Sequence, residues 1–308
     1  MTPVVVELLE PAGVPAVLKL VDEAHESDGF VPLSDRAALS LRHGADKVKH
    51  VVARTPDRDV AGYLQLRDDD GIATGELVVA PSARRQGVAT ALSTWALARL
   101  ETGPKTGPKT GPATGPRARA WAHGNTAAAA GLAAALGFVP GRVVLQMARP
   151  AGDALSAVRL PTGVQVRTFE PGRDDEAWVR ANARAFAGHP EQGQLTIEDL
   201  RERMSEPWFD AAGFFVAERS GADRLAGFHW TKVHERPAPT GEVYAVGVDP
   251  DEQGNGLGRA LTVIGLAHLI ALGVPTLMLY ADESNTGAVH MYGRLGFTVS
   301  STDVTYER

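Results

Sequence analysis

Hydrophobic and polar positions follow the same order twice along this chain. In each half, helical periodicity comes first, and short runs rich in β-branched residues follow, with turn residues between them. A third strand then leads through a glycine-rich loop into a long apolar helix, and another strand and a short helix precede a Gly-Phe and a last strand. Strands that pair as hairpins early and flank a helix later indicate an α/β fold with a mixed sheet in each half. The expected segments are residues 14–25, 48–54, 60–66, 76–81, 88–100 and 117–123 in the first half, and 174–186, 214–218, 225–232, 242–250, 257–272 and 276–281 in the second.

The glycine-rich loop occurs in two copies with the pattern Q/R-x-x-G-x-G/A. Each copy follows a strand-like run that ends in a proline turn, and each opens an apolar helix. A glycine-rich turn at a helix start directs unpaired backbone N–H groups and the positive end of the helix dipole at an anion. We therefore expect each copy to hold a pyrophosphate. The copies are Arg84, Arg85, Gln86, Gly87, Val88 and Ala89, and Gln253, Gly254, Asn255, Gly256, Leu257 and Gly258.

Composition narrows the functional classes. Of 308 residues, 44% are hydrophobic and 22% charged, which is typical of a globular protein with about two domains. The net charge of −6 argues against a nucleic-acid surface. There is no cysteine, the first residues do not form a signal peptide, and the apolar run 260–280 is interrupted by His268 and by a Gly-Val-Pro turn. We expect a cytoplasmic enzyme that acts on small molecules, without a membrane span.

The spacing of landmarks defines the expected domains. The two loops are 169 positions apart, whereas the two Leu-Gly-Phe motifs are 159 apart, so the first half carries ten extra residues. A Thr-Gly-Pro-Lys repeat at residues 102–117 accounts for them. Repeated Gly-Pro favours a solvated loop, with a basic tether as the alternative. We expect one domain at residues 1–150, a linker at 151–163, and a second domain at 164–308.

This order of elements, with the loop motif after the fourth strand of each half, resembles the GNAT superfamily of N-acetyltransferases. The resemblance implies two tandem acetyl-CoA-binding domains. Within the superfamily, the tandem arrangement and the segments 187–193, 241–244 and 285–292 resemble the mycothiol synthase family. That family transfers acetyl from acetyl-CoA to the cysteinyl amine of a cysteinyl-glucosaminyl-inositol. We expect no metal, because His189 has no ligand-spaced partner.

Two residues of the second half are candidates for moving protons. Glu242 begins the motif strand and alternates with Tyr244, Val246 and Val248 on one expected face, where its carboxylate could take a proton from an amine. Tyr292, on the short helix after Asn285, carries a phenol that stays protonated near neutral pH and could donate to a leaving thiolate. From the residues alone, two alternatives remain open: Glu242 could be a solvated residue at the strand end, and Tyr292 could be a packing residue of the core. The resemblance implies a general base at Glu242 and a general acid at Tyr292.

The resemblance also implies binding residues. Backbone at Val246 and Gly247 is expected to pair with the pantetheine arm, Gly247 allowing a close approach, and an N–H near Val248 is expected to polarise the thioester carbonyl. The acceptor is expected to contact Glu26, Glu191, Lys232, Glu242 and Tyr280. The implied acetyl-CoA contacts are Leu77, Val78, Val79, Arg84, Arg85, Gln86, Gly87, Val88 and Ala89 in the first half, and Val246, Gly247, Val248, Gln253, Gly254, Asn255, Gly256, Leu257, Gly258, Arg259 and Asn285 in the second.

The first half departs from the catalytic pattern. The 169-residue separation aligns Glu242 with Ala73, and the 159-residue separation aligns Tyr292 with Ala133. Glu76 is expected to be a charge at the start of the strand, out of register with Glu242. We therefore expect the first half to bind CoA or to brace the second half without catalysing.

Other functions remain open. A different GNAT transferase could act on an aminoglycoside, a polyamine or a protein amine, although Lys232 disfavours such cationic acceptors. A non-catalytic acyl-CoA sensor is a third hypothesis, which the pairing of Glu242 with Tyr292 disfavours. Two fused domains already form a pseudo-dimer, so we expect a monomer.

Overall fold

The computed structural model describes residues 3–69, 71–102, 117–189, 192–235 and 238–308. The chain folds into two compact units. The first comprises residues 1–144 and 301–308, and the second comprises residues 145–300. The last eight residues thus belong to the first unit. The Thr-Gly-Pro-Lys repeat lies almost entirely outside the described residues, at 103–116.

The first unit is a sheet with the strand order β1-β2-β3-β4-β5-β12. Neighbouring strands are antiparallel, except that β4 and β5 are parallel. Side chains from α1, α2 and α3 pack with β2, β3 and β4 in the core of this unit. Its elements are β1 (Val5–Leu8), α1 (Val14–Asp28), α2 (Asp35–His43), β2 (Val48–Thr55), β3 (Arg58–Asp69), β4 (Ile72–Val79), α3 (Val88–Thr102), β5 (Ala118–Ala122), α4 (Ala127–Ala135), the start of β6 (Val139–Pro150) and the end of β12 (Thr298–Glu307).

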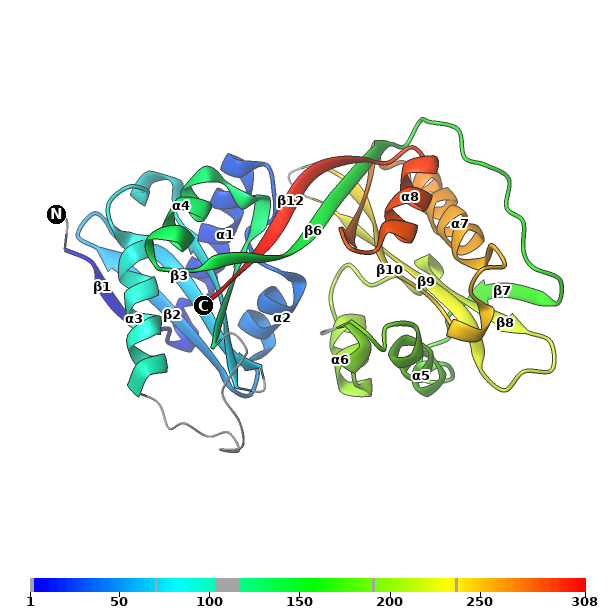
Figure 1. Cartoon of the computed structure of the whole chain (residues 1–308), viewed down its shortest axis with the longest axis horizontal. Helices are drawn as coiled ribbons and strands as arrows, with labels where there is room; N and C mark the ends of the chain where they lie inside the picture. Colours follow the sequence, from blue (N-terminus) through cyan, green and yellow to red (C-terminus); the bar gives the residue numbers. More distant parts are fainter. Residues whose placement is uncertain (1–2, 70, 103–116, 190–191, 236–237) are drawn as a thin grey trace. The chain divides into compact units, whose positions relative to one another are not determined.

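The second unit repeats this plan with the strand order β6-β11-β10-β9-β8-β7. Helices α5 and α6 cover one face of the strands, through an aromatic core that includes Trp178, Phe228 and Trp230, while α7 covers the other face (Figure 1). Its elements are the end of β6, β7 (Val164–Thr168), α5 (Asp175–Ala185), α6 (Ile197–Met204), β8 (Phe214–Arg219), β9 (Leu225–His234), β10 (Thr240–Val248), α7 (Leu257–Ala271), β11 (Thr276–Asp282), α8 (Thr286–Arg294) and the start of β12.

The twelve expected segments are present as strands and helices, with ends displaced by a few residues. The run 260–280 is a helix, a turn and a strand, as predicted. Within the described residues, no helix is both long and apolar enough to cross a membrane. Sequence patterning did not reveal β1, β7, α2 or α6. The strands β1 and β7 have four and five residues, and α2 and α6 have nine and eight, too few for a clear periodicity.

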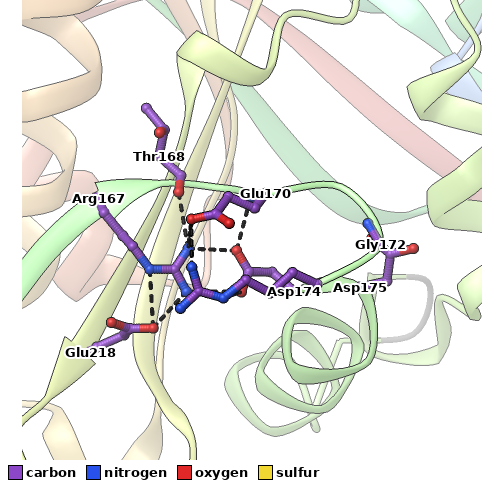
Figure 2. Close-up of polar contacts among 8 residues, drawn as sticks. Arg167, Thr168, Glu170, Gly172, Asp174, Asp175 and Glu218 are labelled. Atoms are coloured by element: carbon purple, nitrogen blue, oxygen red, sulfur yellow. Dashed lines mark hydrogen bonds and ion pairs between the residues drawn. The ribbon is translucent and has the colours of Figure 1, made fainter.

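A charged network fixes the start of α5 against β7 and β8 (Figure 2). The guanidinium of Arg167 on β7 donates to both carboxylate oxygens of Asp174, at 2.6 and 2.8 Å, and to Glu218 on β8 at 2.5 Å. Asp174 also accepts from the backbone N–H of Glu170 at 2.8 Å. The hydrogen bonds from Arg167 hold the pKa of Asp174 below its usual range. The network therefore secures one end of the helix that covers the face where Glu242 lies.

Candidate active site

The strands β10 and β11 separate within the second unit, and the candidate residues cluster around this point. Their parallel ladder runs from Thr240–Thr276 to Val243–Leu279, whereas β10 continues to Val248. Glu242 lies one residue before the last pair, and Tyr280 directly follows it. In the first unit, the ladder between β4 and β5 ends in the same way at Glu76–Trp121. Both units thus contain a parallel strand pair that opens toward the glycine-rich loop.

A β-bulge at Tyr244 decides which side chains share a face with Glu242. Opposite β9, Val243 pairs with Thr231 and Ala245 with Trp230, so one extra residue lies on β10. Glu242 and Tyr244 face α5 and α6. The expected alternation of Glu242 with Val246 and Val248 is wrong, because these valines lie beyond the bulge and pack with Leu257 and Leu261 of α7.

Glu242 is buried at 7% exposure, which removes the alternative of a solvated strand-end glutamate. Its Oε2 lies 2.5 Å from Nε2 of His234, near the end of β9. Within the described residues its other oxygen, Oε1, has no hydrogen-bond partner. Lys232 pairs with Glu242 across the strands, and its ammonium lies 4.5 Å from the ring centre of Trp208 and 5.2 Å from that of Tyr244. The carboxylate therefore has one oxygen held and one available.

Tyr292 lies in a buried position on α8. Asn285 caps the start of the helix, and its Oδ1 accepts from the N–H of Ala288 at 3.2 Å. The ring of Tyr292 meets Phe297 edge-on, with centroids 6.1 Å apart. Burial raises the pKa of Tyr292 to about 12, so the phenol keeps its proton at neutral pH. In the described part of the chain, the phenol makes no hydrogen bond, which leaves its proton available to a ligand.

The second glycine-rich loop has the form expected of an anion site. Gly254 and Gly256 have φ of 80° and 89°, and a Cβ at either position would meet no atom within 4 Å. Gly256 caps α7, which begins at Leu257. The side chain of Asn255 accepts from the N–H of Leu257 at 3.0 Å and so orients the turn. The loop and helix start therefore fit the pyrophosphate of acetyl-CoA.

Gly247 has a structural reason to be glycine. A Cβ at this position would lie 2.6 Å from the ring of Phe228 and 3.0 Å from the Cβ of Ala185. Packing inside the second unit thus already excludes larger residues. The expected approach of a pantetheine arm to Gly247 stays a prediction.

The first unit contains a cavity of about 780 Å³. Of the expected first-half contacts to acetyl-CoA, all except Gln86 line this cavity. Trp121 and His123 line it as well. Gly87 has φ of 87°, and α3 begins at the next residue. Arg84 is committed to a bidentate ion pair with Asp28, at 2.7 and 2.8 Å. Apart from that arginine, the loop and cavity fit a second CoA molecule.

Among its described residues, the first unit offers no counterpart of the two candidate catalytic groups, but one alignment needs correction. β10 contains the bulge at Tyr244, whereas β4 has none. Residues of β10 that precede the bulge therefore lie 168 positions, rather than 169, after their counterparts in β4. Hairpin register then matches Glu242 with Thr74, each paired with a basic residue, Lys232 or Arg67, and not with Ala73. Helices α4 and α8 correspond along their whole length, which does place Ala133 opposite Tyr292.

Glu76 is not a charge at the strand start, as expected, but the centre of a buried polar cluster. Its carboxylate accepts from the backbone N–H and the hydroxyl of Ser34, both at 2.7 Å, and lies 3.1 Å from Nε2 of His123. The other ring nitrogen of His123 lies 2.8 Å from Asp303. Burial opposes the charge of His123, yet hydrogen bonds to Asp303 and Glu76 raise its pKa to about 10. A buried charged cluster thus lies beside the end of the parallel ladder in the first unit.

The expected acceptor contacts fall into three groups. Lys232, Glu242 and Tyr280 lie in the second unit near the separation of β10 and β11, with Tyr280 at 38% exposure. Glu26 is exposed on α1 in the first unit. Glu191 lies outside the described residues. Sequence analysis missed His234, although its position two residues after Lys232 places both on one strand face.

The match to a known family agrees with this geometry. The model of the acetyltransferase (GNAT) family matches residues 16–103 and 178–297, one region in each half. The solved structure of a GCN5-related N-acetyltransferase from Sphaerobacter thermophilus has a TM-score of 0.72 at 24% identity, covering 100% of this chain and 96% of that one. A tandem GNAT protein from the clavulanic acid biosynthesis pathway has a TM-score of 0.71 at 20% identity, covering 99% and 98%. The fold and site thus define a tandem GNAT acetyltransferase.

Curated relatives narrow the family further. A mycothiol acetyltransferase of Thermobispora bispora is 49% identical, over 98% of this chain and 99% of its own length. One of Thermomonospora curvata is 52% identical, over 94% and 92%. The chain therefore belongs to the GNAT acetyltransferases and, within them, to the mycothiol acetyltransferases.

Proposed function

We propose that this enzyme transfers acetyl from acetyl-CoA to the cysteinyl amine of 1D-myo-inositol 2-(L-cysteinylamino)-2-deoxy-α-D-glucopyranoside, giving mycothiol and CoA. The observation that carries this proposal is the identity of about half of all residues, over nearly the whole chain, with relatives named mycothiol acetyltransferase. We further propose a cytoplasmic monomer with a CoA-binding domain at 1–150, a linker at 151–163 and a catalytic domain at 164–308, whose last residues, 301–308, pack within the first unit.

Bound acetyl-CoA would supply the thioester whose carbonyl carbon the amine attacks. Glu242 takes the first proton from the substrate ammonium on Oε1, which has no partner among the described residues, and the freed nitrogen lone pair attacks the carbonyl carbon. As the carbon–sulfur bond breaks, Tyr292 donates its proton to the thiolate. The nitrogen of the adduct releases its second proton to solvent, and the tyrosinate regains a proton from solvent. The structure supports both roles in different ways: Glu242 is buried beside the separation of β10 and β11, and burial raises the pKa of Tyr292 to about 12, so its phenol stays protonated. A backbone N–H near Val248 polarises the carbonyl.

The first unit binds acetyl-CoA without turnover. Its cavity and loop support binding, while Thr74 and Ala133 at the two catalytic positions cannot replace a carboxylate and a phenol. In the second unit, Lys232, Glu242 and Tyr280 contact the acceptor, joined by Glu26 and Glu191. The ammonium of Lys232 disfavours a polyamine or aminoglycoside, since like charges repel.

The test is the release of free CoA from acetyl-CoA with the cysteinyl-glucosaminyl-inositol, beside an aminoglycoside and a polyamine. We expect turnover with the first acceptor alone. Release of CoA with another amine alone would support acetyl transfer and would refute the cysteinyl-glucosaminyl-inositol as the acceptor. Glu242→Gln should lower kcat by about 10²- to 10⁴-fold, most severely at and below neutral pH, where more of the amine is protonated. An unchanged pH–rate profile would remove Glu242 from the mechanism.

A further inference from the structure

The side chain of His234 approaches Glu242 from the neighbouring strand. Glu242 pairs with Lys232 on β9, and His234 follows two residues later, directly opposite Thr240. Residues two apart on a strand project to the same face, so His234 and Lys232 flank the carboxylate together. Among the side chains that the structure describes, the histidine is the one that bonds to it, with Nε2 lying 2.5 Å from Oε2.

The two ends of the imidazole have different surroundings. Nε2 meets a carboxylate whose side chain is 9% exposed, whereas the His234 side chain as a whole is 24% exposed. Nδ1 has no hydrogen-bond partner within the described residues. A ring that carries its proton on Nε2 can therefore donate to Glu242 without competition from a second hydrogen bond at Nδ1 in the described part of the chain.

We propose that His234 is a positioning residue for the candidate base. By donating from Nε2 to Oε2, it fixes the rotation of the carboxylate and leaves Oε1 as the oxygen that takes the amine proton. That proton leaves Oε1 for water after CoA departs, and the imidazole returns unchanged. This inference rests on the proposed role of Glu242.

Two substitutions separate hydrogen bonding from packing. His234→Leu removes the donor and should lower kcat by about 10- to 100-fold, the rate equivalent of one hydrogen bond to a charged group, with unchanged affinity for acetyl-CoA. His234→Gln keeps an N–H donor at this position. It should recover most of the rate that His234→Leu loses. Glu235→Gln, at an exposed neighbouring position, is the matched control and should keep both the rate and the affinity for acetyl-CoA.

The expected outcomes distinguish this inference from the proposed function. Turnover of the cysteinyl acceptor by wild type, with His234→Leu equally fast, would overturn the role of His234 and leave the function intact. If another amine is the acceptor, the same variants are compared on that amine. If no amine is turned over, ¹⁵N NMR of the imidazole tests the inference. The inference requires the Nε2–H tautomer in wild type, and it requires a smaller population of this tautomer in Glu242→Gln. An Nδ1–H tautomer would refute the inference.

Discussion

Removing one oxygen atom from Tyr292 should abolish most of the activity without affecting the fold. In Tyr292→Phe the ring keeps its buried position and its contact with Phe297. Because the phenol makes no hydrogen bond in the described part of the chain, its loss leaves no partner unsatisfied. We therefore expect a change of less than about 0.5 kcal/mol in the free energy of unfolding, as for substitutions that break no specific interaction.

The effect on rate should be far larger. A positioned general acid contributes about 10²- to 10⁴-fold, equivalent to about 3–5 kcal/mol of activation free energy. The loss should appear in kcat for CoA release, with the affinity for acetyl-CoA preserved. Since burial raises the pKa of Tyr292 to about 12, its titration should not limit the rate between pH 6 and 9.

A second tyrosine provides the opposite control. Tyr63 is also buried, but its hydroxyl lies 2.7 Å from Nδ1 of His50 in the first unit. Tyr63→Phe should cost about 1 kcal/mol of stability and leave kcat unchanged. Equal kcat in Tyr292→Phe and wild type would refute the general-acid role. A lower melting temperature with weaker acetyl-CoA binding would make Tyr292 a packing residue.

Three further predictions concern the loops and charged networks. Gly256→Val forces a β-branched residue to φ of 89°, which should lower the free energy of unfolding by about 1–3 kcal/mol and reduce turnover strongly. Gly87→Val should chiefly weaken the binding of CoA to the first unit, which titration calorimetry with CoA can resolve. Arg167→Leu removes the bidentate ion pair from the buried carboxylate of Asp174 and should destabilise the protein by about 2–4 kcal/mol in urea unfolding. Because the folded pKa of Asp174 is lowered, its contribution is present above about pH 4 and is lost as pH falls through the folded value, so an equal difference between variant and wild type at lower pH would contradict this account. The raised pKa of His123 has the opposite sign, so its stabilising contribution is complete below about pH 6.5 and is lost as pH rises toward 10. In urea unfolding, the destabilisation by His123→Gln should be largest below about pH 6.5 and should shrink as pH rises toward 10.

Much of the fold and part of the candidate site follow from local sequence. Strand and helix periods, two glycine-rich turns and the Leu-Gly-Phe ends each depend on neighbouring residues, and they predicted the repeated α/β plan. Gly254 and Gly256 take the positive φ that the motif required. The absence of a phenol opposite Tyr292 was also readable, because α4 and α8 have equal length.

Tertiary structure decided what depends on register and distant contacts. A single extra residue at Tyr244 turns Val246 and Val248 away from the face of Glu242, and no local signal announces a bulge within an apolar strand. The pairing of His234 with Glu242 follows from hairpin register, and the cluster around Glu76 and His123 includes a hydrogen bond between residues 180 positions apart. The sequence alone thus determined which turns and helices form, since these depend on a few adjacent residues. Strand pairing alone decided that His234 bonds to Oε2 of Glu242 and that Glu76, His123 and Asp303 form a cluster in the first unit.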